Sequence, residues 1–297
     1  MENLYPSLLV VLGFAVAAVA LSWLYFRRYQ ITRPPIGVFN LTDIAFMIGG
    51  IILVPYLYLL LPLWLVAGLL LVGTLSVVYF LWEPVLRARW AVWGASLVMV
   101  GADLWAATQF GTVSNRFFIV NNVVLLAMVV GLTNLWAQSG MKARDVTVLG
   151  GFLMFYDLTA TWLLPLMGDM MLRLAGLPLS PMFGWQVGSS GSWVGIGLGD
   201  LLLASVFPLV MRKAFGRMAG AVAMLLALGA IAAIMLLPLK VIFPVMIVLG
   251  PLMIAQYLYW SRRQGKERAT WQYLQAEPLG IGIGVGVGVG VGGRGRK

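Results

Sequence analysis

Residues 147–165, TVLGGFLMFYDLTATWLLP, and residues 193–211, WVGIGLGDLLLASVFPLVM, are two apolar runs that each contain a single charged residue. A helix of about 20 residues crosses the hydrocarbon core of a bilayer, so each run predicts a membrane-spanning helix. The charged residue is an aspartate near the middle of the run, Asp157 in the first and Asp200 in the second. The sequence therefore predicts two membrane helices that carry carboxylates.

Similar runs extend along most of the chain, which has 297 residues, 61% of them hydrophobic and only 10% charged. Soluble domains are about 45–50% apolar, so this composition indicates a membrane protein. Gly, Pro and charged residues separate the runs. We predict an all-α, polytopic membrane protein with nine transmembrane helices, at residues 7–26, 44–62, 64–82, 91–110, 118–137, 147–165, 193–211, 218–237 and 242–260.

Basic residues alternate between the two ends of these predicted helices. Of the 20 Lys and Arg residues, 17 follow the odd-numbered helices, and only Arg116, Arg173 and Lys240 lie on the opposite side. The positive-inside rule then predicts an N-terminus outside and a C-terminus in the cytoplasm. Residues 44 to 82 could form either two helices that meet at Pro62 or one long broken helix. The alternation of basic residues between the two membrane faces favours two helices.

The same charges explain the net charge of +10. Because they cluster at helix ends on one membrane face, anionic headgroups of membrane lipids are the expected partner, and nucleic acid is not. We divide the chain into a nine-helix transmembrane domain at residues 1–261, a basic cytoplasmic juxtamembrane segment at 262–279 and a Gly-rich tail at 280–297. The tail has too few side chains to form a core, so we expect it to be disordered.

The composition also excludes several kinds of chemistry. The chain has no Cys and no His, which excludes Ser-His-Asp triads, Cys nucleophiles and thiolate or imidazole metal sites. The available acids and bases are carboxylates, Tyr and Lys. An ionisable residue inside the membrane is costly, and a function is the first hypothesis for Asp157, Asp200 and also Asp103, which lies at a similar depth.

The depths of Asp157 and Asp200 predict that their side chains meet. At 1.5 Å of rise per residue, Asp157 lies about 15 Å and Asp200 about 18 Å from the cytoplasmic edge, on consecutive helices. Two facing carboxylates in a medium of low dielectric constant share one proton. One then acts as a base on water and the other as an acid toward a carbonyl, which is the chemistry of aspartyl proteases.

The residues around both aspartates resemble a known pair of motifs. Tyr156-Asp157 in the sixth predicted helix and Gly197-Leu198-Gly199-Asp200 in the seventh are similar to the YD and GxGD motifs of the presenilin and signal peptide peptidase superfamily of intramembrane aspartyl proteases. The resemblance includes the number and order of the spans. It extends to prokaryotic presenilin homologues, and it implies a presenilin-like bundle.

The resemblance also implies the roles of individual residues. Asp157 and Asp200 would be the catalytic pair, and no metal or cofactor is implied. Pro244-Val245-Met246, at the start of the ninth helix, stands where the family has Pro-Ala-Leu and differs from it at two positions; Pro238-Leu239-Lys240 is a second candidate for this segment. The implied substrate-binding residues are Tyr156, Gly197, Leu198, Gly199, Pro244, Val245 and Met246.

The predicted orientation is that of signal peptide peptidases, which are inverted relative to presenilins. Transmembrane helices or leftover signal peptides with cytoplasmic N-termini are therefore the implied substrates. The lack of His and Cys and the short loops are compatible with a prokaryotic plasma membrane. The sequence carries no signal for an oligomeric state.

Three other interpretations fit the same carboxylates. A proton- or cation-coupled transporter also uses carboxylates at mid-membrane depth. Type IV prepilin peptidases use a GxGD aspartate as well, although theirs is followed by Lys and Leu201 follows here. A buried, purely structural pair is the third. For Asp103, hydrogen bonds within the bundle, to Thr108, Asn121, Asn122 or Asn134, are the alternative to titration with the pair.

Two further expectations concern local structure. Asp43 lies at the start of a predicted helix, where a carboxylate is expected to cap the helix N-terminus. Small residues in membrane helices allow close helix packing, which we expect at Gly49, Gly50, Gly220 and Gly229.

Overall fold

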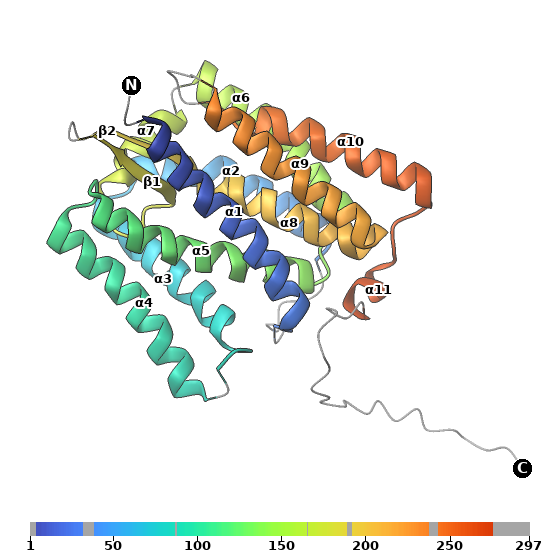
Figure 1. The fold of residues 1–297 in the computed structure, drawn as a ribbon, viewed down its shortest axis with the longest axis horizontal. Coiled ribbons are helices and arrows are strands. Elements are labelled where there is room, and N and C mark those ends of the chain that lie inside the picture. Colours follow the sequence, from blue (N-terminus) through green and yellow to red (C-terminus); the bar gives the residue numbers. More distant parts are fainter. Residues whose placement is uncertain are drawn as a thin grey trace, which may run out of the picture.

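The structure, a computed structural model, describes residues 4–31, 39–86, 88–164, 166–188, 192–237 and 243–275. Most of these residues are helical, and one short two-stranded sheet lies at one end of the bundle (Figure 1). The elements are α1 (Leu4–Arg28), α2 (Leu41–Leu60), α3 (Leu63–Trp82), α4 (Arg89–Phe110), α5 (Asn115–Gln138), α6 (Ala143–Leu158), the π-helix η1 (Thr159–Leu163), α7 (Leu166–Ala175), β1 (Met182–Val187), β2 (Ser192–Gly197), α8 (Leu198–Phe215), α9 (Arg217–Leu236), α10 (Met246–Gln264) and α11 (Thr270–Gln275).

Seven helical segments within the described ranges are long and apolar enough to cross a membrane. They are α1 to α5, α9, and α6 together with η1. The expectation of a mostly helical, multi-pass membrane protein is therefore confirmed. The other two predicted spans correspond to α8, which contains Asp200, Arg212 and Lys213, and to α10, which ends near Arg262-Arg263.

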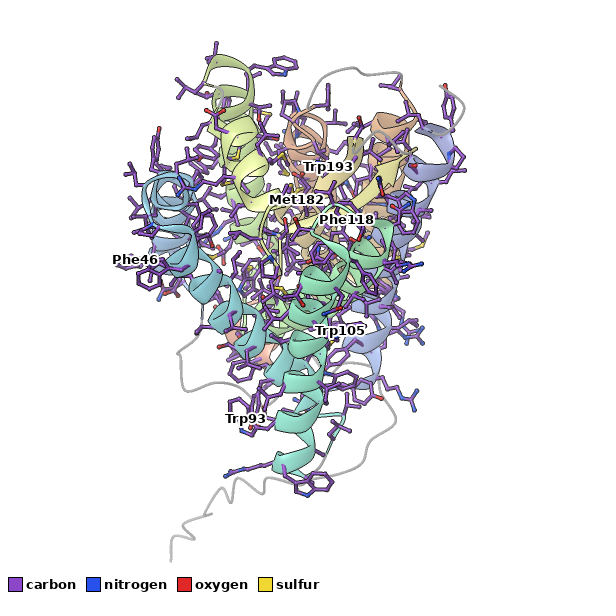
Figure 2. The ribbon with its side chains drawn as sticks, turned by 90° about the vertical axis from the view of Figure 1, so that its left-hand side faces the viewer. Phe46, Trp93, Trp105, Phe118, Met182 and Trp193 are labelled. Atoms are coloured by element: carbon purple, nitrogen blue, oxygen red, sulfur yellow. The ribbon has the colours of Figure 1, made fainter. Side chains whose placement is uncertain are left out.

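The side chains on the outside of the bundle are those expected of a protein surrounded by lipid. Phe46, Trp93 and Trp105 are 76%, 48% and 57% exposed, whereas Phe118 and Met182 are buried (Figure 2). Large apolar side chains that are this exposed on several helices are expected to contact the hydrocarbon of a membrane and not water.

The break between α2 and α3 is real, so residues 44 to 82 form two helices. Leu61 is extended, as the residue before a proline usually is, and α3 begins directly after Pro62. At the other end of α2, Asn40 accepts hydrogen bonds from the N–H groups of Thr42 and Asp43, and Asp43 accepts one from the N–H of Asn40. The expected capping role of Asp43 is confirmed by this reciprocal capping box.

A β-hairpin replaces the start of the seventh predicted helix. Residues 192–197 pair antiparallel with β1, from Val187 opposite Ser192 to Met182 opposite Gly197, so the helix begins at Leu198 and not at residue 193. Alternate glycines are poor helix formers. Gly195 also lies so close to the neighbouring strand that a Cβ there would be 2.6 Å from the carbonyl oxygen of Phe183. Glycine is therefore required for the two strands to approach.

The hairpin is fixed to the bundle by two asparagines on α5. Asn122 donates to the carbonyl of Gly184 and accepts from its N–H, at 3.0 and 3.1 Å. Asn121 donates to the carbonyls of Ser180 and Met182. Because both asparagines are fully buried, these bonds satisfy polar groups that would otherwise be costly inside the bundle.

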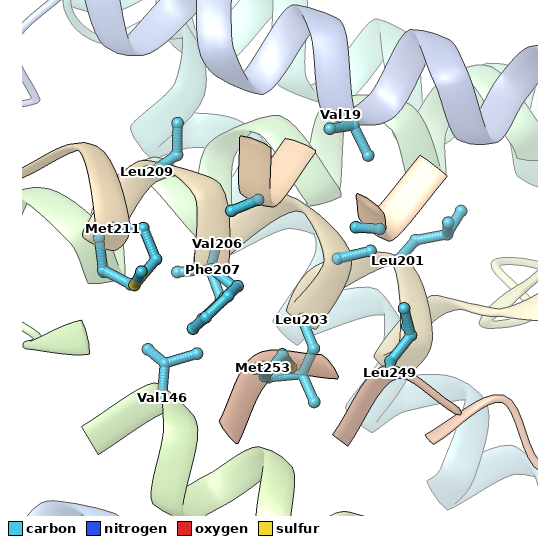
Figure 3. Packing of buried hydrophobic residues seen from close by; sticks show 14 of the residues in the cluster. Val19, Val146, Leu201, Leu203, Val206, Phe207, Leu209, Met211, Leu249 and Met253 are labelled. Carbon is cyan, nitrogen blue, oxygen red and sulfur yellow. The ribbon is translucent and has the colours of Figure 1, made fainter. Parts of the chain in front are cut away.

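The main hydrophobic core lies around α8, which packs against α1, α5, α6 and α9. Leu201, Val206, Phe207 and Leu209 of α8 are almost completely buried in it, together with side chains of α1, α6 and α10 (Figure 3). The helix that carries Asp200 is thus held on nearly all sides.

Close helix packing is confirmed at Gly220 and wrong at the other three glycines. A Cβ at Gly220 would lie 2.6 Å from the Cβ of Arg212 and 2.8 Å from the ring of Trp23. A Cβ at Gly49, Gly50 or Gly229 would meet no atom within 4 Å.

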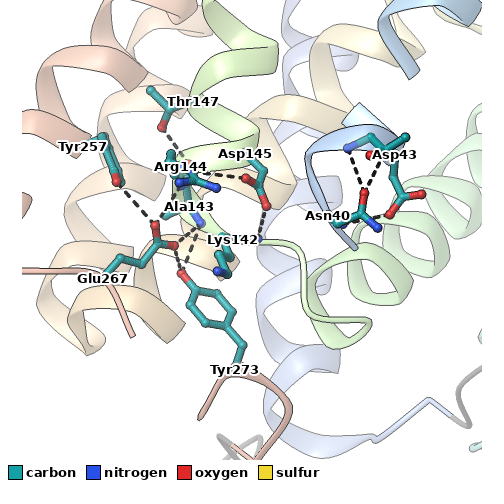
Figure 4. Close-up of polar contacts among 11 residues, drawn as sticks. Asn40, Asp43, Lys142, Ala143, Arg144, Asp145, Thr147, Tyr257, Glu267 and Tyr273 are labelled. Carbon is teal, nitrogen blue, oxygen red and sulfur yellow. Dashed lines mark hydrogen bonds and ion pairs between the residues drawn. The ribbon is translucent and has the colours of Figure 1, made fainter. Parts of the chain in front are cut away.

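The end of the described chain closes over the start of α6. Glu267 accepts hydrogen bonds from the N–H groups of Ala143 and Arg144, at 2.6 and 3.2 Å, and from the hydroxyls of Tyr257 and Tyr273 (Figure 4). Burial raises the pKa of Tyr273, and the neighbouring Glu267 raises it further. The segment after α10 therefore caps the helix that carries Asp157. Residues 276–297, which include the predicted tail, lie outside the described residues.

Candidate functional site

One cavity of about 520 Å³ opens between α2, α6, α7, α8 and the start of α10. All nine residues predicted for catalysis or substrate binding line it: Tyr156, Asp157, Gly197, Leu198, Gly199, Asp200, Pro244, Val245 and Met246. They come from three segments that are far apart in the sequence. The structure therefore brings together the two aspartate motifs and the proline segment at the start of α10.

Asp157 lies at the end of α6, and both of its carboxylate oxygens accept hydrogen bonds. Oδ1 accepts from the hydroxyl of Thr161, at 3.1 Å, and Oδ2 accepts from the backbone N–H of Met246, at 3.2 Å. Thr161 reaches back from the π-helix η1, a wide helical turn that often occurs at functional sites. Both bonds orient the carboxyl group relative to the start of α10.

Asp200 lies in the first turn of α8, directly after the hairpin. Its carboxyl group interacts electrostatically with that of Asp157, across the cavity that both residues line. The side chain folds back over the start of the helix, so that a Cβ at Gly197 would lie 3.3 Å from its Oδ2. Glycine at position 197 therefore leaves room for the carboxyl group.

Tyr156, the residue before Asp157, contributes a phenol to the cavity wall, as Tyr58 of α2 does. Its ring stacks on Phe152, with 5.8 Å between the ring centres and an angle of 18°. Within the described ranges the buried hydroxyl has no hydrogen-bond partner. The described residues therefore leave its hydrogen-bonding capacity unused.

Apart from these groups the cavity wall is mostly apolar. Four methionine side chains form part of this wall. They are Met167, Met170 and Met171 of α7 and Met47 of α2. Methionine side chains adapt to ligands of different shape. None of these methionines, nor Thr161, was predicted as a site residue. Met170 and Met171 lie three and four residues after Met167, and this spacing is the sequence signal that places them on one helical face.

Among the described residues, no group of three or more acidic side chains is close enough together to hold a metal ion. Two carboxyls that interact within an apolar cavity can instead share a proton and activate a water molecule.

Asp103 does not belong to this site, so its titration with the pair is not supported by its position. It is completely buried, and its Oδ1 accepts a hydrogen bond from the N–H of Leu179, at 2.8 Å. The expected partners were wrong, because Thr108, Asn121, Asn122 and Asn134 all donate to backbone carbonyls instead. Asp103 holds the loop before β1, where Leu179 has a φ of 55°.

Arg173, one of the three basic residues on the predicted outer side, does not line the cavity. Arg173 donates hydrogen bonds to the carbonyls of Leu59 and Leu61 at the end of α2. Pro238-Leu239-Lys240, the alternative to Pro244-Val245-Met246, lies outside the described residues.

Comparisons of the chain with protein-family models, curated proteins and solved structures find no match. The function of this chain is therefore inferred from the two motifs and from the geometry of the cavity.

Proposed function

We propose that this protein is an intramembrane aspartyl protease that hydrolyses peptide bonds within transmembrane helices or signal peptides. The observation that carries the proposal is the pair of carboxyl groups, Asp157 and Asp200, which interact with each other in one apolar cavity. The cavity is large enough for a peptide segment of several residues.

The proposed reaction uses the two carboxyl groups and one water molecule. The ionised carboxylate takes a proton from water, whose oxygen attacks the carbonyl carbon of the substrate, while the protonated carboxyl gives its proton to the carbonyl oxygen. The resulting gem-diol then collapses: one of its hydroxyls returns a proton to the carboxylate that had lost one, and the C–N bond breaks. The amine nitrogen takes the proton that the other carboxyl had received from water. Thr161 and the N–H of Met246 keep the carboxyl of Asp157 in place during these transfers. No metal or cofactor takes part.

The substrate would lie as an extended strand along Gly197, Leu198 and Gly199. A Cβ at Gly199 would meet no atom within 4 Å, so this part of the wall has open space beside the backbone. Pro244, Val245 and Met246 would form the opposite wall. Tyr156, whose hydroxyl has no partner in the described part of the chain, would bind the substrate backbone.

The proposal includes the topology. It takes α8 and α10 as the seventh and ninth spans of a presenilin-like bundle, with the N-terminus outside and the C-terminus in the cytoplasm of a prokaryotic cell. The three charged residues of α8 are tolerated in a span because Asp200 faces the cavity and Arg212 and Lys213 lie at the cytoplasmic end.

The test is cleavage of a fluorogenic transmembrane peptide by the purified protein in proteoliposomes. We expect cleavage by the wild type, a loss of at least 100-fold in Asp157→Asn and Asp200→Asn, and inhibition by a hydroxyl-isostere mimic of the gem-diol. Asp169→Asn is the matched control, since Asp169 is exposed and does not line the cavity. Cleavage that persists in both active-site variants would contradict the proposal.

The same proteoliposomes test the transporter interpretation. A pH-sensitive dye inside them would report proton uptake, and uptake that requires both aspartates without peptide cleavage would favour transport.

A further inference from the structure

Three arginines lie near one another where α1 ends, α8 ends and α9 begins. Arg212 contacts the ring of Phe26, the neighbour of Arg27, and it packs against the turn that Arg217 begins. Arg27 is in the last turn of α1, Arg212 is in the last turn of α8, and Arg217 is the first residue of α9. The positive charges of Arg27 and Arg217 act on Arg212. None of the three lines the cavity, so this cluster needs its own explanation.

Arg212 is buried without a full set of hydrogen bonds. It is only 7% exposed, and within the described ranges its Nη1 has no acceptor. The guanidinium lies 4.6 Å from the ring centre of Trp23 and 5.8 Å from that of Phe26. These cation–π contacts offset part of the desolvation cost but satisfy none of the N–H donors. A buried cation in this state is expected to gain an acceptor in its native surroundings.

Among the described residues, no carboxylate neutralises the cluster. In the part of the chain that the structure describes, none of the three arginines forms an ion pair with Asp or Glu. The described residues therefore leave a concentration of positive charge at this point.

The start of α9 adds to the positive potential. Its N-cap is Gly216, no side chain caps its N–H groups, and its first turn contains no acidic residue. Uncapped N–H groups give a helix N-terminus a partial positive charge that attracts anions. Arg212 packs against this same turn, because a Cβ at Gly220 would lie 2.6 Å from the Cβ of Arg212.

We propose that the three-arginine cluster of Arg27, Arg212 and Arg217 binds a phosphate group, and that this phosphate belongs to an anionic phospholipid. Guanidinium groups bind phosphate oxygens through paired hydrogen bonds, and helix N-termini are common phosphate sites. Arg27 and Arg217 are exposed at the ends of apolar helices, which is the depth of lipid headgroups. The cytoplasmic face, which the charge distribution assigns to these residues, is also the face where anionic lipid attracts basic groups. The proposal does not depend on proteolysis.

The experiment uses the full-length protein, delipidated in a neutral detergent. Retention of added phosphatidylglycerol is measured by native mass spectrometry, with phosphatidylcholine and inorganic phosphate as parallel probes. The variants are Arg27→Gln/Arg217→Gln, which changes only exposed side chains, and Arg212→Gln. Arg28→Gln, which removes a neighbouring charge outside the cluster, is the matched control.

We expect the wild type and Arg28→Gln to retain phosphatidylglycerol at least tenfold better than phosphatidylcholine, and the double variant and Arg212→Gln to lose this preference. Retention of inorganic phosphate with no preference for phosphatidylglycerol over phosphatidylcholine would assign the site to free phosphate, which would overturn the lipid assignment. Equal retention of phosphatidylglycerol by the wild type and the double variant would overturn the site itself. Because the double variant leaves the buried Arg212 in place, this outcome does not depend on whether Arg212→Gln folds.

Discussion

Thr161 donates a hydrogen bond from its side chain to Oδ1 of Asp157, and it does so from a π-helix that begins two residues after the aspartate. A second threonine of the same turn, Thr159, instead donates to the carbonyl of Phe155. The two hydroxyls are thus close in sequence but differ in whether they contact the carboxyl group. This difference provides a matched pair of variants.

Thr161→Val should slow peptide cleavage about fivefold through kcat, because the lost hydrogen bond, worth about 1 kcal/mol, orients a catalytic carboxyl group. Thr159→Val should leave the rate within about twofold of the wild type, since its hydroxyl only contacts backbone. The rates are measured on the fluorogenic peptide in proteoliposomes. Equal rates for the two variants would show that the contact with Asp157 does not matter for the reaction.

Asp103→Leu should lower the free energy of unfolding by about 1–3 kcal/mol, because the buried N–H of Leu179 loses its acceptor. Asp103→Asn should be close to the wild type, since the amide oxygen can still accept that bond. Thermal unfolding in detergent measures both. The pH–rate profile of Asp103→Asn should also match that of the wild type, and a changed profile would mean that Asp103 titrates together with the cavity pair after all.

Gly195→Ala should destabilise the protein by about 1–3 kcal/mol, because the new methyl group would collide with the carbonyl oxygen of Phe183 in the neighbouring strand. Gly199→Ala should unfold at the wild-type temperature, since its methyl group has open space. It should nevertheless reduce cleavage severalfold, because the methyl group would stand where the substrate strand is proposed to lie. Normal cleavage by folded Gly199→Ala would argue against that placement of the substrate.

Tyr273→Phe should weaken the cap over the start of α6 and should change the response of stability to alkaline pH. Burial and Glu267 raise the pKa of Tyr273 in the folded protein. Above about pH 10, the unfolded chain releases the phenolic proton that the folded protein keeps, so stability falls as the pH rises. The phenylalanine variant should be less stable at pH 8 and should lose less on going to pH 11.

Tyr259→Phe is the control for this measurement, because Tyr259 is exposed and its hydroxyl contacts only Arg263 among the described side chains. Thermal unfolding is followed for all three proteins across the pH range. An alkaline response of Tyr273→Phe identical to that of the wild type would rule out a contribution from this phenol.

The membrane helices could be located from the sequence because the length and polarity of an apolar run are local properties. The same local view failed at β2, where an apolar stretch with alternate glycines was assigned to a helix. The strand exists because it pairs with β1 and because Asn122 binds Gly184, and neither contact can be read from residues 192–197.

In the candidate site, too, some features could be predicted from the sequence and others depend on contacts between distant segments. Motif order and helix depth were sufficient to predict that Asp157 and Asp200 lie together, and all nine predicted residues line one cavity. The methionines of α7 and the hydroxyl of Thr161 were missed, since their positions depend on how α7 and η1 turn. Asp103 was assigned the wrong partners because its acceptor role involves Leu179, a loop residue 76 positions away.

The arginine that caps α2 also has a consequence for biosynthesis. The last carbonyl groups of a helix have no partner within the helix, and at the end of α2 Arg173 of α7 binds two carbonyls of this region, those of Leu59 and Leu61. Arg173 emerges from the ribosome more than a hundred residues after these carbonyls. Until Arg173 has been translated, α2 and α3 can insert as separate segments. The carbonyls at the break between them gain this hydrogen-bond donor only after α7 has been synthesised. The order of translation therefore makes the junction at Pro62 one of the last parts of the N-terminal half to mature.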